Sequence, residues 1–172
     1  MRNEVIEARG QSGVGLRIEF QWCTDRYGHT VSITDSTGAI IPLLKSIEGH
    51  SEDAWPPSPP LQSLSIETLP DGRRAALLVG MAGGSHWSAS IESIAGQPAL
   101  CFDLACRHSH SPNWLGSRYR RLAGAESKLT IRGEDVRVVY DTQDTVIKPT
   151  APAVPAGTTR WKFAIRLESA EY

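Results

Sequence analysis

Apolar and polar residues alternate over long stretches of the chain, which is the periodicity of a β-strand with one buried face. Every second residue is apolar from Leu16 to Trp22, and the same alternation runs from Thr159 to Leu167. A helix would scatter these apolar residues around its surface, whereas a strand places them on one side. The alternation therefore predicts two half-buried strands, and it places Trp22, Trp87 and Trp161 in the core.

Shorter stretches of the same kind, separated by turn-forming residues, occur at 30–34, 61–69, 74–80, 85–94, 99–108, 128–132 and 136–141. Roughly nine or ten strands at this spacing are typical of an all-β fold. We expect one domain over residues 1–172, an antiparallel β-sandwich or flattened barrel. Pro-rich crossovers are expected at 54–60 and 148–157, because prolines lack the amide donor that a sheet requires. A short helical turn is predicted near Pro42–Glu48.

The charge of the chain is balanced, with 18 basic and 19 acidic residues and a formal net charge of −1. No global field therefore attracts nucleic acid or an anionic membrane, and recognition has to come from a local patch. The odd count of three cysteines favours free thiols and a reducing compartment over a disulfide framework. The N-terminus carries no apolar stretch of a signal peptide, so a cytoplasmic location is expected.

The pairing register of one hairpin can be predicted from the sequence. Ser85–Ile94 and Ala99–Arg107 are joined by four turn-type residues, so Ser93 should face Leu100 and the pairing should continue outward from there. In this register the apolar positions fall together on one face, whereas a slip of one residue would mix the faces. The opposite face then carries Glu92, Ser90, Ser88 and His86 on one strand and Cys101, Asp103, Ala105 and Arg107 on the other.

Two interpretations of this second face remain open. It is either an ordinary solvated surface with cross-strand ion pairs, or a shallow binding floor on which small side chains let a ligand approach. The floor hypothesis assigns ligand binding to His86, Ser88, Ser90, Asp103 and Arg107, with Trp114, Arg118 and Tyr119 on a bordering loop. The expected partner is a small anionic ligand or a protein, and no cofactor is expected.

A metal site is the main alternative. His108 and His110 lie on one side of an extended segment, with His86 as a third candidate ligand. This pattern resembles half of a cupin motif, which implies a metal-dependent β-barrel enzyme. The acidic residue expected a few positions onward is missing, however, and the predicted register points His86 away from His108. The two cysteines of this region, Cys101 and Cys106, fall on opposite faces and do not form a chelating pair.

Other candidate chemistry is weaker. Residues 104–125 contain four arginines and no acidic residue, which would suit an anion or single-stranded nucleic acid. Acidic residues on adjacent strands are expected to neutralise them, namely Glu134, Asp135, Asp141 and Asp144. The sequence thus favours a non-enzymatic small-ligand-binding or protein-interaction module. The alternatives are the metal enzyme and a structural homo-oligomer assembled through an exposed strand such as the C-terminal one.

Overall fold

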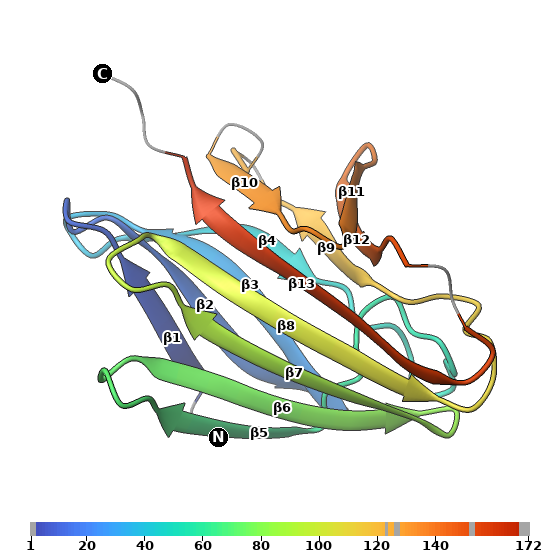
Figure 1. Ribbon diagram of the computed structural model, residues 1–172. Helices are drawn as coiled ribbons and strands as arrows, with labels where there is room; N and C mark the ends of the chain where they lie inside the picture. The colour runs from blue at the N-terminus through green and yellow to red at the C-terminus, as the bar shows by residue number, and fades with distance from the viewer. Residues whose placement is uncertain (1–2, 123, 126–127, 152–153, 169–172) are drawn as a thin grey trace.

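The computed structural model describes residues 3–122, 124–125, 128–151 and 154–168, which form two antiparallel sheets packed face to face (Figure 1). The strand order is β1-β2-β3-β4-β9-β12-β11 in the seven-stranded sheet and β10-β13-β8-β7-β6-β5 in the six-stranded sheet. No helix occurs in these residues, so none is long and apolar enough to cross a membrane. The β-sandwich predicted from the alternation of apolar residues is confirmed.

The seven-stranded sheet consists of β1 (Glu4–Arg9), β2 (Gly15–Cys23), β3 (Arg26–Thr34), β4 (Ile40–Ser46), β9 (Ser117–Arg121), β11 (Val136–Tyr140) and β12 (Asp144–Pro149). The six-stranded sheet consists of β5 (Ser63–Thr68), β6 (Arg74–Ala82), β7 (Ser85–Ser93), β8 (Ala99–His108), β10 (Leu129–Arg132) and β13 (Gly157–Leu167). The described residues thus contain more strands than the nine or ten predicted. In β12 the residues from Asp144 to Ile147 are all buried, so no alternation marks this strand.

The core lies between the two sheets and is built from the apolar positions of the alternating strands. Ile18 and Trp161, one from each long run, are 0% and 1% exposed. Phe102 of β8 and Phe163 of β13 pair directly and stack with ring centroids 4.8 Å apart. Because adjacent strands contribute their inward residues to one layer, the period of two in the sequence becomes a continuous apolar layer.

Two local predictions are wrong. The segment expected to form a helical turn, Pro42–Glu48, begins inside strand β4, where Pro42 sits at a shift of register against β3. Such an irregularity tolerates a residue that has no amide hydrogen to donate. Trp22, predicted to be in the core, is 39% exposed because it lies at the tip of the β2–β3 hairpin, packed edge-on against Tyr27.

Both Pro-rich segments lie in connections between the two sheets, although Lys148, Pro149 and Gly157, expected in the second crossover, belong to β12 and β13. Residues 47–62 run from β4 to β5, and residues 150–156 run from β12 to β13, although 152–153 lie outside the described residues. The first segment is fastened to both sheets: the Ser58 hydroxyl bonds the backbone of Arg118 in β9, and Trp55 packs against Trp87 of β7. The segment therefore forms a fixed cover over one end of the sandwich, which we call the covered end.

Candidate functional site

The β7–β8 hairpin has the register predicted from the sequence. Ser93 pairs with Leu100, Ser88 with Ala105 and His86 with Arg107. Trp87 and Cys106 point into the core, whereas the residues that alternate with them along the two strands point away from it. The five residues assigned to the floor, His86, Ser88, Ser90, Asp103 and Arg107, therefore share the outer face of the six-stranded sheet, which lies toward the viewer in Figure 1.

The two charged residues of β8 on this face have different surroundings. Asp103 accepts two hydrogen bonds from Arg160 of β13, at 2.7 and 2.5 Å, and this ion pair lowers the pKa of the Asp103 carboxyl. Arg107 is exposed, and its side chain makes no hydrogen bond or ion pair with any residue that the structure describes. The guanidinium of Arg107 is thus available to an external acidic group.

The neighbouring strand β6 adds apolar residues that the sequence analysis missed. Leu77, Val79 and Met81 are 46%, 55% and 50% exposed on the same face, opposite Ser90, Ser88 and His86 of β7. The two-residue turn Gly83-Gly84, in which both residues have positive φ, fixes this pairing. A Gly-Gly pair is a strong signal for such a hairpin, so the sequence did contain a feature that indicated the pairing of β6 with β7.

A shallow depression of about 550 Å³ lies at one end of this face, where Val79 and Met81 meet His86 and Arg107. Gly80 of β6 also lines the depression, and on the core side of the strand it is in close contact with residues 60–62. A Cβ atom on Gly80 would lie 1.7 Å from the carbonyl oxygen of Pro60. The depression thus combines exposed apolar side chains with an arginine side chain that pairs with no described residue.

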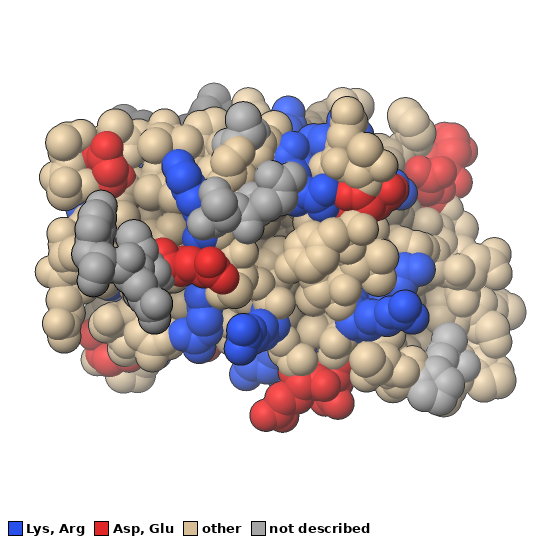
Figure 2. Space-filling model, turned by 90° about the horizontal axis from the view of Figure 1, so that it is seen from above, with Lys and Arg blue, Asp and Glu red and all other residues tan. Residues whose placement is uncertain are grey.

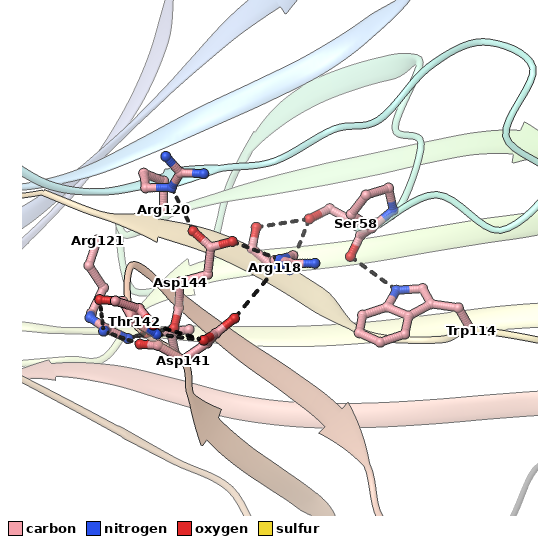
Figure 3. Close-up of polar contacts among 10 residues, drawn as sticks. Ser58, Trp114, Arg118, Arg120, Arg121, Asp141, Thr142 and Asp144 are labelled. Carbon is pink, nitrogen blue, oxygen red and sulfur yellow. Dashed lines mark hydrogen bonds and ion pairs between the residues drawn. The ribbon is translucent and has the colours of Figure 1, made fainter.

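The three residues expected on a bordering loop do not border this face. Arg118 and Tyr119 lie in β9 of the other sheet, so their assignment to a loop is wrong. Tyr119 is 1% exposed and its hydroxyl contacts the His29 ring nitrogen at 2.9 Å. Trp114 does lie in a loop, where it donates a hydrogen bond to the Pro57 carbonyl of the cover (Figure 3).

The prediction that acidic residues neutralise the arginines of β9 is confirmed in part: Asp144 of β12 is the principal partner and Asp141 contacts Arg118, whereas Glu134 and Asp135 form no ion pair with any described residue. The Asp144 carboxylate accepts hydrogen bonds from Arg118 at 2.9 Å and from Arg120 at 2.6 Å, although its own side chain is only 8% exposed (Figure 3). Viewed from above, basic and acidic side chains are intermingled and form no broad field of one sign (Figure 2). On this side of the molecule the described side chains therefore form no extended cationic groove for a phosphate backbone.

The three histidines of the alternative metal site do not converge. His86 is exposed on the outer face, whereas His108 is 4% exposed on the inner side of β8. The ring nitrogens of His108 contact the Thr159 hydroxyl at 3.1 Å and the His110 carbonyl at 3.0 Å. Within the described ranges no three His, Cys, Asp or Glu side chains are grouped so that they could hold a metal ion.

The covered end holds a second polar cluster that no feature of the sequence predicted. Arg26 is 2% exposed and donates hydrogen bonds to the carboxylate of Asp25 and to the carbonyls of Glu48 and His50. Burial raises the pKa of the Glu48 carboxyl to about 7 and lowers the pKa of His29 to about 4. The Oε1 atom of Glu48 is buried and has no hydrogen-bond partner among the described residues.

Fold and outer face together define a β-sandwich with one partly apolar sheet surface, on which the Arg107 side chain pairs with no described residue. No protein-family model matches the chain, and no curated protein matches it at a significant level.

Proposed function

We propose that this protein is a non-enzymatic protein-interaction module that binds its partner through the outer face of the six-stranded sheet. The observation that carries the proposal is the line of half-exposed apolar side chains on β6, Leu77, Val79 and Met81, two strands away from the unpaired Arg107. Contiguous apolar surface with a polar rim is typical of contact sites between proteins.

The shape of the face favours a protein over a small ligand. Small-molecule sites are concave and bury most of the ligand surface. Here the depression is shallow, and its apolar residues belong to a sheet surface that continues beyond it from Met81 to Leu77. Small side chains on β7 and β8, Ser88 and Ala105, leave room for a second surface to approach the sheet.

The covered end is the competing location, and it supports a structural role. Arg26 and Glu48 belong to a network that fastens the cover, and the space beside Glu48, Tyr119 and Phe102 has a volume of about 10 Å³. That volume is no larger than a single water requires. A partner has no access there while the cover is in place.

Selection from a random peptide library tests the proposal. Peptides that bind the full chain should lose at least about tenfold in affinity with Val79→Arg, because the substitution places a charge in the apolar line. Ile40→Arg is the matched control, since Ile40 is 50% exposed on β4 of the other sheet. A library that yields no binder, or binders insensitive to Val79→Arg, contradicts the proposal.

A further inference from the structure

We infer that the partner of the outer face is an acidic amphipathic helix of another protein. The helix lies along strand β7, with its apolar residues on β6 and its carboxylates against β8 and β13. This inference rests on the proposed function, because it names the chemical class of the partner for the same surface. Its basis is the charge of the face, the line of apolar side chains beside that charge and the distance between them.

The outer face of the six-stranded sheet is positively charged, although the whole chain has a formal net charge of −1. Five basic and three acidic residues point outward from its described strands, giving a net charge of +2, namely Arg107, Arg132, Arg160, Lys162, Arg166, Glu67, Glu92 and Asp103. Glu67 and Glu92 lie at the end of the sheet remote from the depression. Since a surface attracts partners of opposite charge and repels those of like charge, this face favours an acidic partner.

Two cations near the depression have no acidic partner within the described part of the chain. Asp103 is the nearest outward carboxylate, and it is already bound to Arg160 by two hydrogen bonds. The side chains of Arg107 and Lys162 make no hydrogen bond or ion pair with any residue that the structure describes. These two side chains are therefore available to carboxylates of a partner.

The two cations run parallel to the apolar line of β6. Arg107 lies in the same row across the strands as Met81, and Lys162 lies in the same row as Leu77. The two rows are four residues apart along the strands, or about 14 Å at the rise of a β-strand. At about 5.4 Å per turn, two to three turns of a helix span this distance.

Small side chains cover the strip between the apolar line and the cations. Ser88 and Ala105 lie in the depression, which Met81, Arg107 and Thr158 also line. From β6 to β8 and β13 is two to three strand spacings, or about 10 to 14 Å. A helix with its side chains is about 10 to 12 Å across, so a helix fits this strip.

An extended strand fits the same strip less well. A strand lying on the face would present every second side chain to it in a single row. A helix instead directs apolar residues toward β6 and, from an adjoining side, acidic residues toward β8 and β13. Contacts to both lines at once therefore favour a helix.

The spacing also argues against a small anion as the occupant. Arg107 and Lys162 are too far apart to bind one phosphate or carboxylate group together, since the two rows are about 14 Å apart. Such an ion would also leave the apolar side chains of β6 exposed. A partner that carries both apolar and acidic residues satisfies both parts of the face.

Binding of synthetic helices to the full chain tests the inference. Three fluorescent peptides of about four turns serve as probes, each held helical by a hydrocarbon cross-link on its outer side. The first carries leucines along one side and glutamates on both flanks, and the second has lysine in place of each glutamate. The third contains the residues of the first in an order that mixes leucine and glutamate around the helix. The first should bind at least about tenfold more tightly than the other two.

Charge reversal on the face should reverse this preference. Arg107→Glu and Lys162→Glu should each weaken binding of the glutamate helix at least about tenfold, because like charges then meet across the interface. The double variant should bind the lysine helix more tightly than the glutamate helix. Arg137→Glu is the matched control, since Arg137 is exposed on β11 of the other sheet. Unchanged thermal midpoints show that the variants are folded.

Each part of the inference has its own contrary result. A glutamate helix that binds no better than the lysine helix overturns the acidic character of the partner. Equal binding of the mixed-order peptide overturns the amphipathic arrangement, and equal weakening by Arg137→Glu overturns the location.

These outcomes are distinct from failure of the proposed function. If library peptides still depend on Val79 while the glutamate helix shows no preference, the outer face remains the contact site and the acidic helix is wrong. If no binder depends on Val79, the proposed function itself fails.

Discussion

The covered end and the outer face of the six-stranded sheet both contain arginine, but in opposite states. Arg26 at the covered end is 2% exposed and binds one carboxylate and two backbone carbonyls. Arg107 on the outer face is exposed, and its side chain binds no described residue of the chain. A buried charge has to be satisfied within the fold, whereas an exposed one is free for an external partner.

This difference assigns the two regions different roles. The contacts of Arg26 hold the start of the segment 47–62 against the β2–β3 hairpin, so its loss should reduce stability. The Arg107 side chain binds no described residue, so its loss should affect binding and leave the fold intact. Substitutions in the two regions should therefore separate stability from interaction.

Arg26→Ala should have the largest effect on stability. The substitution leaves the carbonyls of Glu48 and His50 without their donor and creates a cavity at the covered end. Loss of a buried charged hydrogen-bond network of this kind costs about 3 kcal/mol. The measurement is the free energy of unfolding in urea. A loss below about 1 kcal/mol would mean that the cover is held mainly by its apolar contacts, such as Trp55 on Trp87.

The parts of the fold that the sequence predicted are those where one face of a strand is buried. The β7–β8 register followed from a four-residue turn and the apolar alternation, and the structure pairs Ser88 with Ala105 accordingly. Strand β12 escaped prediction because burial on both faces removes the alternation. Strand β4 was mistaken for a helical turn, since a proline at a register shift interrupts its pattern.

The outer face was predicted in part, and the covered end not at all. His86 and Arg107 were placed by periodicity, which is a local property of the sequence. The contact between His29 and Tyr119 joins residues 90 positions apart, and the burial of Glu48 depends on the path of a loop. Such contacts follow from the packing of the two sheets. No periodic pattern in the sequence marks them, so they could not be predicted from it.

Glu48→Gln should give the second-largest effect, and it should depend on pH. The pKa of Glu48 is about 7 in the folded protein and near 4.5 when exposed. A carboxyl with a raised folded pKa stabilises the fold below pH 4.5, and this contribution disappears as the pH rises through 7. The stability of the variant relative to the unmodified protein should therefore rise by about 2.5 kcal/mol between pH 5 and pH 8.

Unfolding in urea at the two pH values measures this difference. His29 has the opposite dependence, because its lowered pKa of about 4 gives stability that is lost as the pH falls from 6.5 toward 4. It contributes equally to both proteins, so it cancels when the variant is compared with the unmodified chain. A difference between them that is the same at pH 5 and pH 8 would show that Glu48 is solvated in the folded protein.

Asp144→Asn is the intermediate case, because Asp144 is buried while its two partners are half exposed. Arg118 and Arg120 are 36% and 49% exposed, so solvent screens both ion pairs. The expected loss is about 1 kcal/mol of unfolding free energy, and it should shrink in high salt. A loss as large as that of Arg26→Ala would place this network with the buried structural contacts of the covered end.

Arg107→Ala should have the smallest effect on the fold, within about 0.5 kcal/mol of unfolding free energy, as for other surface substitutions. The side chain contributes no hydrogen bond or ion pair to the described structure, and its neighbour Asp103 keeps its own partner, Arg160. Urea unfolding measures this difference. A variant that unfolds much more easily than the unmodified chain would show that the Arg107 side chain stabilises the sandwich itself, and the contrast with Arg26 would disappear.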